Sequence, residues 1–546
     1  MKSITNSTRL AAAPLSRARR AWAHGWLSSA VTAALLACGC ASNEAQSPTE
    51  PTALDLALGA IGGEARLAEL GSFSITSSGL RRDIGEGYAV DSEPRDVGTF
   101  ELTTRYDVAG DRLRLDYQRT ILLTGAPPVV KTFSEIVSGN LGYISGEESL
   151  FGFPAGDMLS DRLASIRRQQ RLLNPHLILR DAAADRSLVS ERAPEVLEGR
   201  EHLVLEIDDA VHPLSLFVDA ESGHITRLAT LENHHFYRDV VIEVGYADWQ
   251  LGQGSLAFPR GLTLTVDQQV VHEETRGAVQ IDAPLSDETF AFPETAAPTF
   301  DEAAAERGHH THQFHQIFAS IGIPLDGLQT TLTAVEIAPG VHHLTGGIHN
   351  SLAIEQENGL VLVDAPLYEA RSEVILDWAE QTFPDKPISH VISTHFHVDH
   401  AGGLRRFVAE GATVIAGDAS VDFLSRSFSA PSTVVPDVLS GTGAQATIHP
   451  VAANGSWTIE DSMRPVLAYQ IENEHAADML IAYLPVEKIV FVSDIYSPGI
   501  GVVDQAGPAA LHKAITQTHQ LDVALLAGGH GATATLADLE AELLPQ

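Results

Sequence analysis

The stretch STHFHVDHAGG, residues 393–403, constrains the fold and the chemistry of this chain more than any other. It follows an apolar run that predicts a buried strand, so it belongs to a loop at a strand's carboxyl end, where α/β folds place their sites. Side chains two apart in an extended loop point the same way, so His395 and His397 can converge on one ion. Asp399 and His400 come after the chain begins to turn and can face a second ion. The stretch therefore predicts a metal site.

Residues 331–546 show an alternation of apolar strand-like runs and helical patterns, which predicts an α/β domain. Three more metal-capable side chains lie at or beside predicted strand ends: His475, Asp494 and His530. Both cysteines of the chain, at 38 and 40, lie far from them, so a metal must be held by His, Asp and Glu. Zn²⁺ accepts imidazole and carboxylate ligands without a thiolate.

The order HxHxDH, then His, Asp and His, resembles the metallo-β-lactamase fold superfamily, whose domains are αββα sandwiches. The resemblance implies that His395, His397 and His475 bind one metal ion, that Asp399, His400 and His530 bind another, and that Asp494 bridges both. Asp364, which ends the strand LVLVD, matches an early aspartate of the family. It would orient a ligand or the motif loop by hydrogen bonding, or serve as a structural aspartate at a strand end.

The function implied is hydrolysis by a metal-bound hydroxide, with two zinc ions per chain and iron or manganese as alternatives. Asp399 would be the catalytic residue that orients the hydroxide. An aspartate at the bridging position is more typical of the superfamily's thioesterases, lactonases and phosphodiesterases than of its drug-hydrolysing β-lactamases. We therefore expect an ester, thioester, lactone or amide of a small molecule as substrate, and we expect residues 420–456 to form part of the pocket rim and to set specificity. The alternatives are a mononuclear iron oxygenase on the same fold, or a lipid- or ligand-carrying lipoprotein with an auxiliary metal domain.

Residues 53–293 contain many runs that alternate apolar and polar positions, which predicts a mainly antiparallel β domain. The pattern weakly resembles the half-barrel carrier domains of lipoprotein-sorting proteins. Residues 294–330 are expected to be a His-rich linker. Four histidines crowd it, and we interpret them as part of a solvated helix or linker, with an adventitious metal site as the alternative: His309, His310, His312 and His315.

The N-terminus predicts export. Residues 1–40 join a basic segment, an apolar run at 27–37 and the sequence LLACGC, which resembles the lipobox of bacterial lipoproteins. Lipidation would fall on Cys38 or Cys40, and residues 41–52 would be a flexible tether. The expected location is the cell envelope, at the periplasmic face of the outer membrane. An uncleaved N-terminal anchor is the alternative.

The charge balance bears on the partners. The chain has 35 Lys and Arg against 71 Asp and Glu, a formal net charge of −36. Nucleic-acid binding needs a basic surface, so we expect no nucleic-acid partner. A length of 546 residues predicts more than one domain, in agreement with the change of pattern near residue 331.

Overall fold

The computed structural model describes residues 51–123, 126–150, 155–252, 255–500 and 505–543. The predicted signal, lipobox and nearly all of the predicted tether lie outside these residues, so those predictions stay untested. Pro51–Gln546 forms one compact unit. Within the described part of the chain, no helix combines the length and apolarity needed to cross a bilayer.

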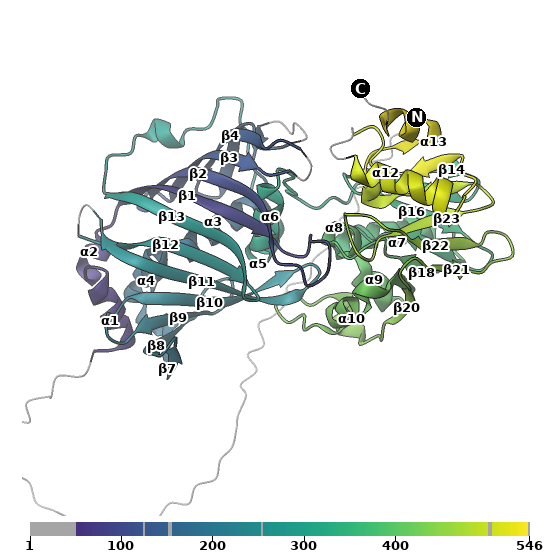
Figure 1. The fold of residues 1–546 in the computed structure, drawn as a ribbon. Coiled ribbons are helices and arrows are strands. Elements are labelled where there is room, and N and C mark those ends of the chain that lie inside the picture. Colours follow the sequence, from purple (N-terminus) through teal and green to yellow (C-terminus); the bar gives the residue numbers. More distant parts are fainter. Residues whose placement is uncertain (1–50, 124–125, 151–154, 253–254, 501–504, 544–546) are drawn as a thin grey trace, which may run out of the picture. The chain divides into compact units, whose positions relative to one another are not determined.

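The first part of this unit is built on one large antiparallel sheet (Figure 1). Its order is β6-β5-β4-β3-β2-β1-β13-β12-β11-β10-β9-β8-β7, so neighbours in sequence are mostly neighbours in space. The first and last strands, β1 and β13, pair with each other in the middle of this sheet, with Phe73 opposite Ile281. The strands are β1 (Ser72–Asp83), β2 (Arg95–Asp107), β3 (Arg112–Ile121), β4 (Val129–Ser138), β5 (Leu141–Gly146), β6 (Gly156–Asp157), β7 (Val189–Leu197), β8 (Arg200–Ile207), β9 (Leu214–Asp219), β10 (Ile225–His234), β11 (Arg238–Leu251), β12 (Ala257–Val266) and β13 (Gln269–Ile281).

Helices pack against one face of this sheet (Figure 1). Alternate strand residues point to that face, as the period-two pattern predicts. Part of the interface is apolar: Leu172 and Ile178 join the inward side chains of β8 to β12. Elsewhere it is charged. Arg162, 1% exposed, pairs with Glu135 at 2.5 Å. The helices are α1 (Ala53–Ala60), α2 (Glu64–Ala68), α3 (Ser160–Leu173), α4 (Pro175–Ala184), α5 (Glu302–His310) and α6 (His312–Ser320).

The His-rich stretch differs from the solvated linker that its composition predicts. α5 and α6 pack on α3, and the side chain of His312 is fully buried. Its Nδ1 bonds Glu232 and its Nε2 lies 2.9 Å from Gln169. A polar helix is buried here because the opposing helix and strand supply hydrogen-bond partners for its side chains. The imidazole of His312 is therefore part of the core of the antiparallel domain.

Residues from 333 onward form two stacked sheets with helices outside them (Figure 1). The first has the order β14-β15-β16-β17-β18-β19-β20 and is parallel from β17 to β20. Its elements are β14 (Thr333–Ala338), β15 (Val341–Thr345), β16 (Ser351–Glu355), β17 (Leu360–Val363), α7 (Glu369–Thr382), β18 (Ile388–Ile392), α8 (Val398–Ala401), α9 (Leu404–Ala409), β19 (Thr413–Gly417), α10 (Val421–Ser429), α11 (Val438–Thr442) and β20 (Thr447–Val451).

The second sheet has the order β21-β22-β23-β24-β25-β26. Its elements are β21 (Ser456–Ile459), β22 (Val466–Gln470), β23 (Leu480–Leu484), β24 (Ile489–Phe491), α12 (Ala506–Lys513), β25 (Leu525–Ala527), β26 (Thr533–Ala534) and α13 (Leu536–Leu543). In β17, Val361 and Val363 face the layer between the sheets, whereas Leu360 and Leu362 face the helices. Both faces are buried, which is why such strands are apolar at every position. The predicted antiparallel domain followed by an αββα domain is confirmed.

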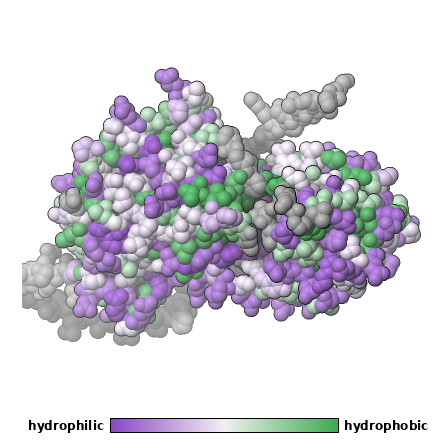
Figure 2. Space-filling view, turned by 45° about the horizontal axis from the view of Figure 1, so that its top comes forward, coloured by the Kyte–Doolittle hydropathy of each residue, from purple (hydrophilic) through white to green (hydrophobic). Residues whose placement is uncertain are grey.

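The connection between β10 and β11 packs on the α/β domain. The ring centroids of Phe236 and Phe423 are 5.1 Å apart, and the Ser427 hydroxyl donates a hydrogen bond to the Phe236 carbonyl at 2.7 Å. Asp239 accepts hydrogen bonds from the backbone and the hydroxyl of Thr433, at 2.8 and 2.6 Å. Part of the stretch expected at the pocket rim thus packs against the other domain. The face shown in Figure 2 mixes hydrophilic residues with apolar ones, which gather near its middle.

Candidate metal centre

The HxHxDH segment lies between β18 and α9, and close backbone packing restricts the residue types along it. Gly402 leaves no room for a side chain, because a Cβ there would lie 2.1 Å from the carbonyl oxygen of Leu367. Ser393, at the start of the loop, donates its backbone N–H to Ile415 of the neighbouring strand. The loop therefore continues from the carboxyl end of a parallel strand, where the sequence predicts it.

Three histidines meet in a first group. His475 Nε2 lies 3.3 Å from His395 Nε2 and 3.1 Å from His397 Nδ1. The rings of His395 and His397 are almost fully buried, whereas the side chain of His475 is 36% exposed. Asp494 Oδ2 completes this group, 3.4 Å from His475 Nε2.

A second group is formed by Asp399, His400, His530 and Asp494. The other oxygen of Asp494, Oδ1, lies 2.6 Å from His400 Nε2 and 3.0 Å from His530 Nε2. Asp399 Oδ2 lies 3.6 Å from His400 Nε2 and 3.8 Å from His530 Nε2. Asp494 thus presents one carboxylate oxygen to each group.

The far nitrogens of three of these rings have acceptors that fix the tautomer. His400 Nδ1 donates to Asp364 Oδ2 at 2.8 Å, and His530 Nδ1 donates to the carbonyl of Ile348 at 2.7 Å. His397 Nε2 donates to the carbonyl of Gly87 at 2.9 Å. When the ring is neutral, each donation leaves the nitrogen that faces its group without a proton, which is the form that binds a metal.

Asp364 is held in place by several hydrogen bonds. It is fully buried, with a backbone φ of 62°, and it also accepts hydrogen bonds from the backbone and hydroxyl of Thr394 at 2.8 and 2.9 Å. It therefore orients both His400 and the start of the motif loop.

The two groups fit metal ions. Ligands at about 2.0–2.1 Å in a tetrahedral zinc site are about 3.3 Å from one another, and the imidazole nitrogens of the first group are 3.1 and 3.3 Å apart. A proton on His475 Nε2 would serve only one of these two contacts, whereas a cation between the three nitrogens satisfies them all. Asp399 Oδ1 is moreover buried and has no hydrogen-bond partner among the described residues. The donor set of imidazoles and carboxylates suits Zn²⁺ and also Fe or Mn.

Burial and the neighbouring charges shift the pKa of the groups in this site. Burial lowers the pKa of His397 to about 3, and it lowers the pKa of His395 as well, so both rings are neutral. Burial alone would lower the pKa of His400 and His530, but the nearby carboxylates, above all Asp494, raise it for both. Burial would raise the pKa of Asp399, but His400 lowers it, so this group is a carboxylate.

The structure thus brings together all seven residues proposed as ligands, in the two groups implied by the resemblance. Two further side chains have no motif to reveal them. His349 Nε2 lies 3.2 Å from Asp399 Oδ2, and Glu86 Oε2, from the β1–β2 connection, lies 3.3 Å from His397 Nδ1. Burial lowers the pKa of His349 to about 4, so its neutral ring donates to Asp399. Both contacts arise from tertiary packing.

Comparison with known proteins places this site in a family. A family model for the metallo-beta-lactamase superfamily matches residues 344–535. These residues are a metallo-beta-lactamase superfamily domain. The match begins in β15 and ends just before α13, so it includes every proposed ligand and Asp364. The predicted resemblance is confirmed for this part of the chain.

Curated relatives of this superfamily domain cover short parts of the chain. A metallo-beta-lactamase type 2 of Bacteroides fragilis is 23% identical over 173 residues, which are 30% of this chain and 61% of the relative. An (R)-specific secondary-alkylsulfatase of Pseudomonas sp is 37% identical over 87 residues, 16% of this chain and 13% of the relative. The alpha subunit of a 2,4-dinitroanisole O-demethylase of Nocardioides sp. (strain JS1661) is 25% identical over 114 residues, 20% and 35% of the two chains. The chain thus spans less than two thirds of each relative.

Solved structures with a similar fold include a metallo-beta-lactamase from Pontibacter korlensis, 20% identical, with a TM-score of 0.31 over 39% of this chain and 97% of that one. Another is FIM-1 from Pseudomonas aeruginosa in the mono-zinc form, 20% identical, with a TM-score of 0.32 over 40% of this chain and 95% of that one.

Proposed function

We propose that this protein is a dinuclear metal-dependent hydrolase, with zinc as the metal in both positions. The observation that carries the proposal is Asp494, whose Oδ1 faces His400 and His530 and whose Oδ2 faces His475. A carboxylate that offers one oxygen to each of two ligand groups matches a pair of ions held close together. Such a pair, when bound, activates a water molecule as nucleophile and polarises the bond that is cleaved.

The residues of the chain have separate roles in this proposal. His395, His397 and His475 hold one ion, and His400 and His530 hold the other with Asp399. Asp399 Oδ1 is buried and has no hydrogen-bond partner in the part of the chain that the structure describes, so it is available to accept a hydrogen bond from the attacking water. Asp399 takes up the proton that the attacking water loses, and the leaving group takes a proton from Asp399 or from solvent. No Ser or Cys nucleophile is needed.

We propose an ester, thioester, lactone or amide of a small molecule as the substrate. The resemblance of part of the chain to two alkylsulfatases of Pseudomonas sp, one of them acting on linear primary alkyl sulfates by its name, makes a sulfate ester a further compound to assay. The acidic composition of the chain disfavours polyanionic substrates, because like charges repel.

A mononuclear iron oxygenase would use one ligand group only. The second group here is as complete as the first, with two imidazoles and two carboxylates. This favours two ions over one.

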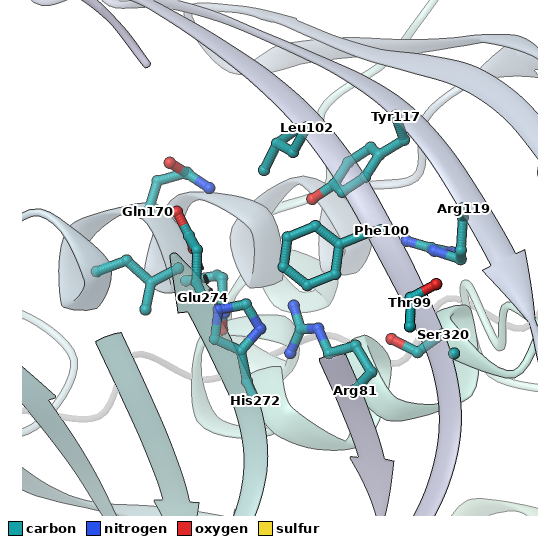
Figure 3. Close-up of a pocket in the computed structure, with 13 residues that line it drawn as sticks. Arg81, Thr99, Phe100, Leu102, Tyr117, Arg119, Gln170, His272, Glu274 and Ser320 are labelled. Carbon is teal, nitrogen blue, oxygen red and sulfur yellow. Dashed lines mark hydrogen bonds and ion pairs between the residues drawn. The ribbon is translucent and has the colours of Figure 1, made fainter. Parts of the chain in front are cut away.

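The alternative of a lipid- or ligand-carrying protein would place the carried molecule in the antiparallel domain. A pocket between its sheet and helices is lined by Arg81, Phe100 and His272 among others, with the Arg81 guanidinium directed at the two rings (Figure 3). Its volume is about 10 Å³, which holds one water molecule and excludes a lipid. Two open grooves of the same domain, of about 630 and 710 Å³, carry many polar side chains, such as Ser78 and Arg200.

We also propose that the protein is exported and anchored by a lipid on Cys38 or Cys40, in the bacterial envelope at the periplasmic face of the outer membrane. This rests on the basic segment, apolar run and LLACGC sequence of the N-terminus. Globomycin sensitivity of processing, with Cys38→Ala and Cys40→Ala variants, tests it.

The proposed activity is tested by metal analysis and a substrate screen. The purified protein should contain two ions per chain and hydrolyse at least one of a lactone, thioester, ester, amide or sulfate ester. Asp399→Asn should lower the rate by about 10²–10⁴-fold. One iron per chain with oxygen consumption would refute the hydrolase, and an unchanged rate in Asp399→Asn would refute the mechanism.

A further inference from the structure

The connection between β1 and β2, residues 84–94, reaches from the antiparallel domain to the metal centre. The carbonyl of Gly87 accepts the Nε2 hydrogen of His397, and the carbonyl of Tyr88 accepts the backbone N–H of Ala477 at 2.7 Å, two residues from His475. Val90 packs against the apolar core of the α/β domain. This connection, which we call the β1–β2 loop, therefore contacts the two chain segments that carry the three-histidine group.

Glu86 is the residue of this loop that enters the centre. Its Oε2 lies 3.3 Å from His397 Nδ1, and Glu86, His397 and Asp399 form a third group with atoms close enough to share one ion. The Glu86 side chain is 16% exposed, and its Oε1 is buried and makes no hydrogen bond to any residue that the structure describes. A carboxylate in that position needs a counter-charge or a hydrogen-bond donor.

His397 cannot supply that donor. Its single ring hydrogen is on Nε2 and is used by the Gly87 carbonyl. Its Nδ1 is therefore a bare acceptor, and it faces two further polar atoms, Glu86 Oε2 at 3.3 Å and His475 Nε2 at 3.1 Å. One proton can serve only one pair of these three atoms. A cation between them satisfies all three at once.

We propose that Glu86 is an additional ligand of the ion held by His395, His397 and His475, so that the antiparallel domain completes the metal centre of the other domain. The inference rests on the proposed metal centre. It gives the antiparallel domain a direct role, because this domain supplies a carboxylate to that ion and, through Gly87, fixes the tautomer of one of the ion's histidines. The sequence motif of the α/β domain contains neither group.

The test compares metal binding in the full-length protein with Glu86→Gln and Glu93→Gln. Glu93 is an exposed carboxylate of the same loop and serves as the matched control. Zinc affinity is measured by competition with a chromophoric chelator, and the Co²⁺-substituted proteins are compared by their visible absorption, which reports the ligands directly. Circular dichroism and thermal unfolding of the metal-free proteins check that each variant folds.

Glu86→Gln should weaken one of the two zinc ions by at least about tenfold and alter the Co²⁺ bands. Glu93→Gln should leave both unchanged. Glu86→Asp, which keeps the charge on a shorter side chain, should give an intermediate affinity. The inference is overturned if Glu86→Gln folds and binds both ions with the affinity and Co²⁺ spectrum of the unaltered protein, in which case the metal centre itself stands. If the unaltered protein binds no ion, the proposed function fails first. If Glu86→Gln does not fold, a Glu86→Asp spectrum identical to that of the unaltered protein overturns the inference.

Discussion

Replacement of Asp364 by Asn tests whether the hydrogen bonds that hold a metal ligand in place control the affinity for metal. The substitution keeps the shape of the side chain, and Asn tolerates the positive φ of 62° at this position well. What changes is the acceptor count. The carboxylate accepts three hydrogen bonds of 2.8–2.9 Å, from the backbone and hydroxyl of Thr394 and from His400 Nδ1. An amide offers one acceptor oxygen and a donor NH₂ group.

The hydrogen bonds that are lost depend on which carboxylate oxygen the NH₂ group replaces. If the amide oxygen keeps the backbone N–H of Thr394, the NH₂ faces His400 Nδ1, and the ring must move its hydrogen to Nε2, the atom that faces Asp494 at 2.6 Å. If the amide is flipped, two donors face each other at Thr394 instead. Loss of such supporting hydrogen bonds lowers metal affinity by about 10–100-fold, which is about 1.4–2.7 kcal/mol.

The assay is thermal unfolding with and without zinc, together with chelator competition. Asp364→Asn should bind the ion at His400 more weakly and lose about 1.4–2.7 kcal/mol of the stabilisation that saturating zinc confers. Asp377→Asn, on the exposed face of α7, is the control and should bind zinc like the unaltered protein. Wild-type zinc affinity in Asp364→Asn would refute the role assigned to this carboxylate.

Three other outcomes are expected. His349→Gln removes the ring that donates to Asp399, and steady-state kinetics should show a kcat about tenfold lower with both ions retained; an unchanged kcat contradicts this. In the metal-free protein, carboxylates raise the pKa of His400 and His530, so zinc must displace protons from these rings and the zinc affinity falls as the pH drops. The folding stability that the protonated rings confer on the metal-free protein is present below the unfolded pKa of about 6.5, and it is lost as the pH rises through the raised folded pKa. Calorimetry in buffers of different ionisation enthalpy measures the proton release, and its absence would disprove the assignment. Phe423→Ala should lower the free energy of unfolding by about 3–5 kcal/mol in denaturant titrations, because the ring is 7% exposed between the two domains; a loss below about 1 kcal/mol would show that the contact is not formed in solution.

The sequence was informative where chemistry restricts the residue type. Metal ligands must be His, Asp or Glu in this chain, and a strand buried on both faces must be apolar throughout, so the loop at 393–403 and its strand were predictable. Residues 312–320 show where prediction from the sequence fails. Their polar side chains predict a solvated helix, but His312 meets Glu232 and Gln169 across the core of the other domain. Such pairing depends on a fold that composition does not encode.

Glu86 and Gly87 were invisible to the sequence for a related reason. Gly87 lies 310 residues before His397, in a loop without a motif, and it acts through a backbone carbonyl that any residue possesses. His349 likewise stands in a loop before β16, with nothing in its neighbourhood to separate it from an ordinary buried histidine. Only the packing of the two domains brings the β1–β2 loop to the centre.

The β1–β2 loop has a tightly determined shape. Gly85 has a φ of 79°, and a Cβ on it would lie 2.0 Å from the hydroxyl of Tyr237. A Cβ on Gly87 would lie 2.5 Å from the side chain of Ser92. These close approaches favour glycine at both positions of the loop. Among the seven proposed ligands, only His475 has a side chain as much as 36% exposed, the others being between fully buried and 19% exposed. The exposed side of His475 is therefore the part of this ligand set that solvent reaches most easily.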